Sequence, residues 1–452
     1  MTECNQSSFE FKAQSSRGVV ARFDGGTMTS DAGALLLRQT DRRLNLLARL
    51  AGCFEDRRNP IYISHSVLEL ISQRVYGLAL GYEDLSDHDQ LRQDPLLGLL
   101  SGKKEVGEQP LAGKSTLNRL ELSTEQPSRY KKIHYRAERI DELLVAVFVE
   151  AHAAPPQQIV IDLDVTDLAL HGHQEGRFFH GYYDEYCYLP LYIFCGEHLL
   201  CARLRTADRD AAAGSKEEAE RIVGQIRQAW PETQIILRAD SGFCREELMN
   251  WCEENGVGYV IGFARNERLR RMIDPQMEQA RREHEQTGKP ARVFTEFSYQ
   301  TTTGSWSRAR RLVAKAEQIE GKENPRFVVT NLNADQWAAR PLYEDLYCER
   351  GEMENRIKEQ FMLFATRVSA ETMSANQLRL YFSSTAYVLM HGLRRLGVKG
   401  TEWARAQAQT IRLRLLKIGA RIRITVRKVW ISMASSYPMQ AVFAQAWRQL
   451  RC

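Results

Sequence analysis

The sequence predicts an α/β protein with a mixed sheet, built from elements in the order βββαβαβα. Three observations support this prediction. Runs rich in β-branched residues at 157–165 and 235–239 have the character of strands. Segments with the apolar spacing of helices occur at 215–230 and 245–255. The composition, with 43% hydrophobic and 26% charged residues, is ordinary for a globular protein.

The individual elements follow from local patterns. Before residue 155 the apolar spacing is mostly helical, with candidate helices at 31–50, 65–80 and 138–152. The first three strands form a meander, and two helices then alternate with two further strands. In chain order these elements are strands 157–165, 186–196 and 198–205, helix 215–230, strand 235–239, helix 245–255 and strand 258–263.

We expect the chain to divide into five regions. Consecutive prolines at 155 and 156 mark the first boundary, and about eighty residues after 263 exceed what the sheet requires. Strand patterns at 292–299, 308–315 and 326–330 make that excess β-rich. The regions are a helical N-terminal region at 1–155, the first part of the core at 156–264, a β-rich insertion at 265–340, the last core helices at 341–395 and a basic C-terminal region at 396–452.

One predicted helix carries an acid among basic and aromatic residues. Tyr347, Arg350, Glu354 and Lys358 fall on one helical stripe. A carboxylate in this setting suits a cation bound beside a phosphate backbone, which Arg, Lys and Tyr would contact. The alternative is a solvated helix face with i,i+4 charge pairs.

Two strands end in acids. In the 157–165 strand, Asp162 and Asp164 share one face, and Asp240 follows the 235–239 strand directly. The carboxyl ends of strands are where open α/β sheets bind their ligands. The alternatives are an exposed edge strand for the first pair and a helix cap for Asp240.

The order of elements allows these acids to converge. Strand 157–165, the end of strand 235–239 and a late helix would bring Asp164, Asp240 and Glu354 together. Three carboxylates are an oxygen-rich site of the kind that Mg²⁺ or Mn²⁺ prefers.

Positive charge is concentrated near the end of the chain. The net charge is only +5, so a nucleic-acid partner must be argued from distribution. Residues 391–430 are rich in Lys and Arg and contain one acid, Glu402. Within them, 421–431 alternates like a strand, with Arg421 and Arg423 on a cationic face suited to phosphate. An edge strand protected by charge is the alternative.

At this point the sequence resembles a known family, the DDE transposases of bacterial insertion sequences, and within it most closely the group-one DDE transposases. The resemblance rests on blocks that span nearly the whole chain, namely the FDGGTMTSDAGALLL run from Phe23, Asp164-Val-Thr166, the HGHQEG run from His171, the RADSGF run from Arg238 and the Tyr347 to Lys358 segment. It implies a ribonuclease H-like (retroviral-integrase) fold for the core. It also selects Asp164, not Asp162, as the first catalytic acid, with Asp240 and Glu354 as the others. The family signature places Lys seven residues after Glu, where this chain has Phe361, so Lys358 is the nearest basic residue.

The resemblance further implies an activity. The protein would bind the terminal inverted repeats of its element as double-stranded DNA, cleave them and join the ends to target DNA. Two Mg²⁺ (or Mn²⁺) ions held by the three acids would drive hydrolysis and transesterification. The N-terminal region would recognise the ends, a homodimer would hold two ends together, and Trp306 would stack on a flipped base. Packing of Trp306 on its own sheet is the alternative.

Two other functions stay open on the sequence. A structure-specific nuclease of the same fold would cut DNA without joining it, and a transposase-derived binding protein would do neither. The nine cysteines lack paired spacing, and the first twenty residues lack an apolar segment. We therefore expect no membrane association and a cytoplasmic protein at the bacterial nucleoid.

Overall fold

The computed structural model describes residues 8–103, 106, 109–123, 129, 131–302 and 304–451. The chain forms two compact units. Unit one comprises Met1–Arg136, Met362–Phe364 and Thr385–Cys452, and unit two comprises Ala137–Phe361 and Ala365–Ser384. Within the described residues, no helix combines the length and the apolar character that crossing a membrane requires.

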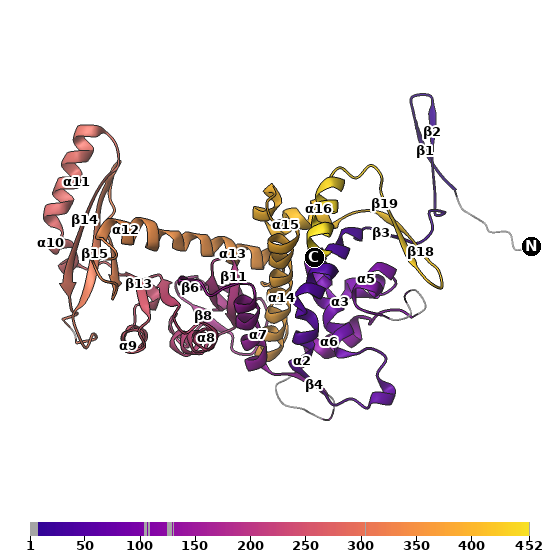
Figure 1. The fold of residues 1–452 in the computed structure, drawn as a ribbon, viewed down its shortest axis with the longest axis horizontal. Helices are drawn as coiled ribbons and strands as arrows, with labels where there is room; N and C mark the ends of the chain where they lie inside the picture. The colour runs from indigo at the N-terminus through magenta and orange to yellow at the C-terminus, as the bar shows by residue number, and fades with distance from the viewer. Residues whose placement is uncertain are drawn as a thin grey trace, which may run out of the picture. The chain divides into compact units, whose positions relative to one another are not determined.

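Unit two is built on a mixed sheet (Figure 1). Its first five strands are β6 (Gln158–Val165), β10 (Leu191–Cys195), β11 (His198–Arg203), β12 (Gln234–Ala239) and β13 (Gly258–Phe263). They lie in the order β11-β10-β6-β12-β13. β10 is antiparallel to both neighbours, whereas β12 runs parallel to β6 and to β13. This order and these directions are those of a ribonuclease H-like core, so the predicted fold class is confirmed.

Helices follow the strands as the apolar spacing predicts. α8 (Ser215–Ala229) lies between β11 and β12, and α9 (Glu246–Glu254) lies between β12 and β13. The predicted strand at 186–196 is wrong in one respect. It divides into β9 (Glu185–Tyr188) and β10, and β9 joins a small separate sheet with β7 (Leu168–Ala169) and β8 (Phe178–His180). Pro190 stands between them, and its missing amide hydrogen cannot continue a strand ladder.

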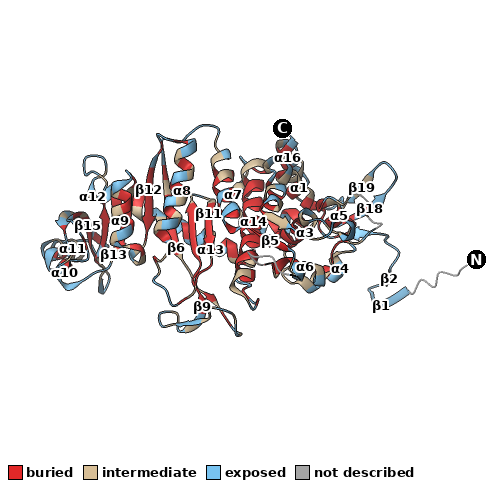
Figure 2. Ribbon diagram, turned by 90° about the horizontal axis from the view of Figure 1, so that it is seen from below, coloured by how far each residue is buried: buried red, intermediate tan, exposed pale blue. Residues whose placement is uncertain are grey.

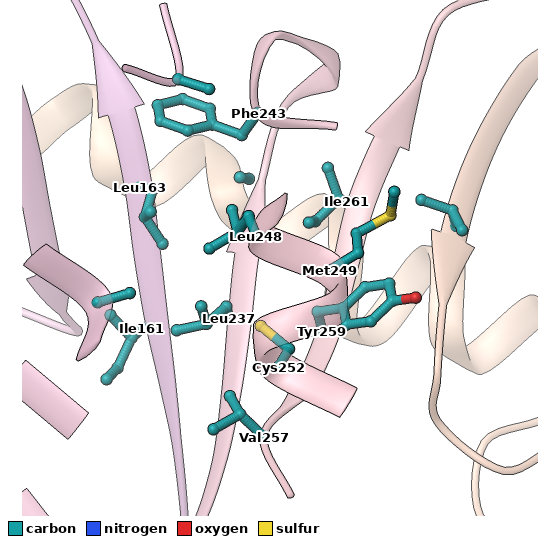
Figure 3. Close-up of a cluster of buried hydrophobic side chains, with 14 of the residues drawn as sticks. Ile161, Leu163, Leu237, Phe243, Leu248, Met249, Cys252, Val257, Tyr259 and Ile261 are labelled. Atoms are coloured by element: carbon teal, nitrogen blue, oxygen red, sulfur yellow. The ribbon is translucent and has the colours of Figure 1, made fainter. Parts of the chain in front are cut away.

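One face of the sheet forms the main core. Figure 3 shows Leu248, Met249 and Cys252 of α9 lying over Leu237 and Tyr259 of the sheet. Most residues of β6, β12 and β13 are buried (Figure 2). Burial of each large apolar side chain contributes about 1.5–3 kcal/mol. This packing makes the strand ends a rigid edge on which side chains can be positioned.

Three more strands extend the same sheet beyond β13. β17 (Arg326–Thr330) pairs with β13, β15 (Arg310–Ile319) pairs with β17, and β14 (Ala291–Tyr299) completes this side. All three pairings are antiparallel. α11 (Asp274–Thr287) packs on β14 and β15 (Figure 1). The strands expected in the insertion are therefore continuous with the core sheet.

A long helical segment covers the opposite face of the sheet. It runs through α12 (Ala339–Pro341), the π-helical turn η5 (Leu342–Tyr347), η6 (Cys348–Arg350) and α13 (Gly351–Met362). Leu342 and Leu346 pack against Val260 and Val328 of the sheet. Because η5 is anchored in this way, the helix that carries Glu354 has a defined position relative to the strands.

Unit one combines helices with a three-stranded sheet. α3 (Val67–Leu80) begins with a capping box between Ser66 and Glu69. The predicted helix at 31–50 is wrong as a single element, because Asn45 adopts a left-handed conformation, with φ of 50°, between α1 (Leu35–Leu44) and α2 (Leu46–Gly52). The predicted strand at 421–431 is a hairpin of β18 (Ala420–Ile424) and β19 (Val429–Met433).

Candidate active site

Asp164 lies near the end of β6 on the face opposite the main core. Ile161 and Leu163 point into the core, so the period-two alternation places Asp162 and Asp164 on the other face. The Asp164 side chain is largely buried, and its Oδ1 accepts a hydrogen bond of 2.9 Å from the Val165 amide. A carboxylate buried here requires a balancing positive charge.

Asp162 already has such a charge. Arg238 donates from Nε to Asp162 Oδ1 at 2.5 Å and from Nη2 to Oδ2 at 2.9 Å. Its third nitrogen, Nη1, donates to the carbonyl of Leu346 in η5. The bidentate pair therefore ties β6 and β12 to the covering helix. Both oxygens of Asp162 are therefore occupied by Arg238, whereas Asp164 has a single contact of 3.3 Å with Arg350.

Asp240 lies beside Asp164 on the neighbouring strand. β12 is parallel to β6, with Ala239 opposite Leu163, so the two acids are the next residues along adjacent strands. Neighbouring strands are about 4.8 Å apart. Asp240 also caps the turn that follows, because its Oδ1 accepts from the Gly242 amide at 2.8 Å. Asp240 therefore caps the following turn and also lies at the carboxyl end of β12, so both interpretations of the sequence describe its position.

Arg350 connects the third acid to the first. Its Nη1 lies 3.3 Å from Asp164 Oδ2, and its Nη2 lies 3.9 Å from Glu354 Oε1. Glu354 belongs to α13, one turn beyond Arg350, and more than half of its side chain is exposed. The tertiary structure thus brings the three acids predicted from sequence to one edge of the sheet.

The electrostatics of this edge favour a cation. Burial raises the pKa of Asp164 to about 6, while Arg350 and the Val165 amide oppose the shift. The charges of Asp240 and Glu354 raise it further. Three carboxylates are the oxygen ligands that Mg²⁺ and Mn²⁺ prefer, so the donor set fits such ions. Within the described residues, no group of three or more His, Cys, Asp or Glu side chains is arranged so that it could hold a metal ion.

The raised pKa of Asp164 predicts a pH-dependent stability. The raised pKa means that the folded state favours the protonated form of Asp164. The free energy of unfolding therefore falls as the pH rises from about 4 to about 6, and the effect of Asp164 is constant above that range. Without divalent metal, Asp164→Asn should be more stable than the wild type by about 3 kcal/mol at pH 7 and equally stable near pH 4. Urea unfolding in EDTA at both pH values measures this difference.

Metal provides the control for that prediction. Added Mg²⁺ should raise the urea midpoint of the wild type and leave Asp164→Asn nearly unchanged, because only ligand binding to the folded state stabilises it. If the substitution changed the free energy of unfolding equally at both pH values, the Asp164 carboxylate would not destabilise the folded protein.

Tyr347 closes one side of this edge. A Cβ atom on Gly262 would lie 2.6 Å from the Tyr347 hydroxyl and 2.9 Å from the Ser241 amide nitrogen. Only glycine permits the β13 backbone to approach Tyr347 and the Asp240 turn so closely. Burial raises the pKa of Tyr347, so its hydroxyl stays protonated as a donor. Lys358 is exposed on α13 one turn beyond Glu354.

The ring of Trp306 is packed inside the protein and is not accessible to DNA at this edge of the sheet. It is only 4% exposed, and its ring centroid lies 5.0 Å from that of Phe263 and 5.9 Å from that of Tyr299. The Arg310 guanidinium lies over the ring at 5.4 Å. The structure has the packed arrangement that the sequence analysis held as the alternative, and base stacking would require the ring to leave it.

Arg421 and Arg423 belong to unit one, on the exposed face of β18. β18 pairs with β3 (Met28–Thr29), and the Ile422 amide donates to the Thr27 carbonyl at 2.8 Å. The segment that begins at Phe23, one of the motifs that carry the family resemblance, therefore supports this hairpin through β3 and Thr27.

A buried ion pair missed by the sequence analysis holds the same region. Asp31 Oδ1 forms an ion pair of 2.6 Å with Lys417 Nζ, and Asp31 Oδ2 accepts a hydrogen bond of 2.7 Å from the Tyr82 hydroxyl. Asp31 stood in the quoted block, but nothing in the pattern indicated a partner some 390 residues away.

This sheet has the ribonuclease H-like order, with one acid on β6, one directly after β12 and one on α13. Nucleases and transposases are the class of proteins built on this fold. The chain belongs to the family described as Transposase DDE domain group 1, which matches residues 11–452. The family makes the protein a transposase and an enzyme acting on DNA, as the resemblance implied. A cryo-EM structure of piggyBac transposase in a synaptic complex with hairpin DNA aligns with a TM-score of 0.41 and 10% identity, covering 86% of this chain and 80% of that chain. No curated protein sequence matches the chain.

Proposed function

We propose that this protein is the transposase of a bacterial insertion sequence, which binds the terminal inverted repeats, cleaves them and joins the ends to target DNA. The observation that carries the proposal is the convergence of Asp164, Asp240 and Glu354 around Arg350 on the sheet edge. Family membership supports the same reaction class.

The three acids are proposed to hold two Mg²⁺ (or Mn²⁺) ions. Bound there, the ions would activate the attacking oxygen and stabilise the leaving oxygen of a phosphodiester. The charges of Asp240 and Glu354 both act on Asp164, so we propose that Asp164 contributes to both ions. Amides in these positions would lack the negative charge that a divalent cation requires.

Arg350 has a second proposed role. In this structure its guanidinium balances Asp164 and Glu354, and a cation bound to the acids would release it. A free guanidinium at this edge is suited to a DNA phosphate. Tyr347 and the exposed Lys358 are the other proposed DNA contacts on the same helical segment.

The hairpin of β18 and β19 is the proposed DNA-binding element of unit one. Residues 417–433 contain Lys417, Arg421, Arg423, Arg427 and Lys428 and no acid. Among the described residues, no carboxylate forms an ion pair with the last four of these cations. Unpaired cations on an exposed strand pair are suited to the phosphates of double-stranded DNA.

Replacing Arg421 and Arg423 together by Gln should weaken binding to all duplex sequences alike. Loss of two phosphate contacts should make the slope of log affinity against log salt less steep by about two. Fluorescence anisotropy across a salt series measures the slope. The control is Arg271→Gln with Arg282→Gln, which removes two exposed cations of unit two. An unchanged slope in the hairpin variant would exclude phosphate contacts by Arg421 and Arg423.

The test of the proposed function is cleavage and joining of a labelled duplex that carries the parent element's end. The wild type with Mg²⁺ should nick or cut at the element boundary and transfer the 3′ end into a second duplex. Cutting without transfer would favour a structure-specific nuclease, and binding without either step would favour a non-catalytic protein.

We also propose that a homodimer holds two ends together. Analytical ultracentrifugation of the protein with end DNA measures the number of protein chains in the complex.

A further inference from the structure

A cavity on the main-core side of unit two plays no part in the proposed chemistry. Its volume is about 300 Å³, and it lies between the end of β11 and the beginning of α8. One lining residue, Leu191, belongs to the main core. Asp164 and the helical segment that carries Glu354 lie on the opposite face of the sheet, so the cavity is separate from the candidate active site. Its lining includes Arg205, Arg209, Gly214 and Glu217, and we call it the Arg205 pocket.

Arg205 is buried in the wall of this pocket without an acidic partner. It is only 8% exposed. Its Nε donates to the carbonyl of Leu189 at 2.9 Å, and its Nη1 donates to those of Ala211 and Ala213 at 2.9 and 2.6 Å. Within the described chain, its Nη2 has no hydrogen-bond partner. A buried charged donor without a partner is costly, so a bound anion would satisfy this nitrogen.

The first turn of α8 supplies further donors. α8 begins at Ser215, and its N-cap is Gly214, which has no side chain to cap the helix. Among the described residues, the amides of Lys216 and Glu217 donate to no acceptor. The space beside Gly214 is open, because a Cβ atom there would meet no other atom within 4 Å. Free amides and the helix dipole make such a helix end a site for anions.

Two other charged residues of the lining, Arg203 and Glu218, are balanced within the protein. Arg203 Nη2 lies 2.5 Å from Asp141 Oδ2 and 2.9 Å from Glu218 Oε1. Glu218 Oε2 lies 2.9 Å from Arg221 Nη2. These two cations and two acids neutralise one another, so their network adds no net charge to the pocket.

Arg205 and Arg209 leave the pocket with a net positive charge. Arg209 is exposed, and in the part of the chain that the structure describes no carboxylate pairs with it. The acid that follows it, Asp210, is bound by Arg245 at 2.7 Å. Burial, together with the charge of Arg209, lowers the pKa of Arg205 to about 10. Against these two cations stands one exposed acid, Glu217, so an anion between the cations would be attracted.

A phosphate group suits these donors better than a carboxylate does. The donors come from several directions, namely the guanidinium groups of Arg205 and Arg209 and the first amides of α8. A carboxylate has two oxygens in one plane, whereas the oxygens of a phosphate point to the corners of a tetrahedron. Guanidinium groups form strong charge-assisted hydrogen bonds with phosphate, and helix N-termini bind the same group.

We propose that the Arg205 pocket binds a phosphate group, held by Arg205 Nη2, the Arg209 guanidinium and the free amides at the beginning of α8. A backbone phosphate of DNA and free inorganic phosphate share this chemistry, and the experiment below distinguishes them. The proposal does not rest on the proposed function, because none of the three acids takes part in it.

The test follows the modification of Arg209 by phenylglyoxal, a reagent for accessible arginines, in the full-length protein. Mass spectrometry of the digested protein measures the rate at each arginine. Inorganic phosphate at ten times its Kd should slow the reaction of Arg209 about tenfold, because only the unbound protein reacts, and chloride at equal ionic strength should not. Arg271, which is 75% exposed on α10 (Glu267–Met272), is the internal control and should react at a constant rate. An Arg209 rate that is the same in phosphate and in chloride would overturn the proposal.

Two exposed residues allow the binding groups to be identified without loss of the fold. In calorimetric titration with inorganic phosphate, Arg209→Gln should bind about tenfold more weakly, since a charge-assisted hydrogen bond is lost. Glu217→Gln should bind more tightly, since an opposing charge is removed. Arg271→Gln is the matched control and should bind as the wild type does. Arg205→Gln is less suitable, because it would also remove the three contacts with carbonyls. Wild-type affinity in Arg209→Gln would exclude the site.

Duplex DNA without divalent metal distinguishes the two sources of phosphate. If DNA protects Arg209 from phenylglyoxal and DNA with an uncharged methylphosphonate backbone does not, the pocket binds a DNA phosphate. If inorganic phosphate alone protects Arg209, the pocket binds free phosphate. Both results support the proposal. A protein that is protected in either way but neither cuts nor joins DNA would keep the Arg205 pocket and overturn the transposase proposal alone.

Discussion

Asp164→Asn, Asp240→Asn and Glu354→Gln are each expected to abolish cleavage and joining while leaving DNA binding intact. Each change removes one negative charge from the three acids that we propose to hold divalent cations. Several kcal/mol of transition-state stabilisation are then lost, which corresponds to at least about a thousandfold in rate. The measurement is single-turnover cleavage of labelled end DNA with Mg²⁺, with binding followed separately by anisotropy.

Glu352→Gln is the matched control for these variants. Glu352 lies on α13 two residues before Glu354, is 72% exposed and forms an ion pair with Arg356 at 3.6 Å. Its loss changes the charge of the helix equally but touches none of the three acids, so cleavage should be within about twofold of the wild type. Cleavage by Asp164→Asn at the wild-type rate would contradict the proposed mechanism.

The second large effect is on stability and concerns the pair between Asp162 and Arg238. Asp162→Ala should lower the stability of unit two by about 3–5 kcal/mol, because buried Arg238 would keep only a longer ion pair, 3.6 Å, with the exposed Glu349. For a unit of this size the thermal midpoint should fall by about 10 °C. Calorimetry or circular dichroism measures the change.

Two comparisons make that prediction specific. Asp210→Ala breaks an ion pair of similar length, 2.7 Å to Arg245, but both side chains are about half exposed, so the loss should stay below about 1 kcal/mol. Replacing both members, Asp162→Leu with Arg238→Met, should recover most of the stability, because no charge then remains buried. A double variant as unstable as Asp162→Ala would show that shape, and not charge, sets the cost.

Much of the fold could be predicted because its information is local. Strand alternation in 157–165 and helical spacing in 215–230 are periodic patterns that each segment carries itself. The errors came from single residues with special backbone properties. Pro190 separates β9 from β10, and Asn45 breaks a helix that the apolar spacing continues.

The acids of the candidate site and Arg350 beside Glu354 were predicted from the sequence, but the pairing of cations with acids from other elements was not. The family motif pointed to Asp164, Asp240 and Glu354, and strand order made their convergence plausible. That Arg238 neutralises Asp162 while Arg350 contacts Asp164 depends on side-chain distances across the sheet. The sequence around Trp306 is compatible both with a ring packed on its own sheet and with a ring exposed to DNA. Its low exposure in the structure shows that the ring is packed.

The class of the sheet and the order of its elements could be predicted from the sequence alone, because they depend on periodicity and chain order. The three acids were predicted from the motifs that carry the family resemblance. Only the tertiary structure showed that Arg238 forms a bidentate pair with Asp162 while Asp164 has a single, longer contact with Arg350. It also showed that the segment near residue 23 supports the hairpin of β18 and β19. These features arise from contacts between residues far apart in the chain, whose distances no local pattern contains.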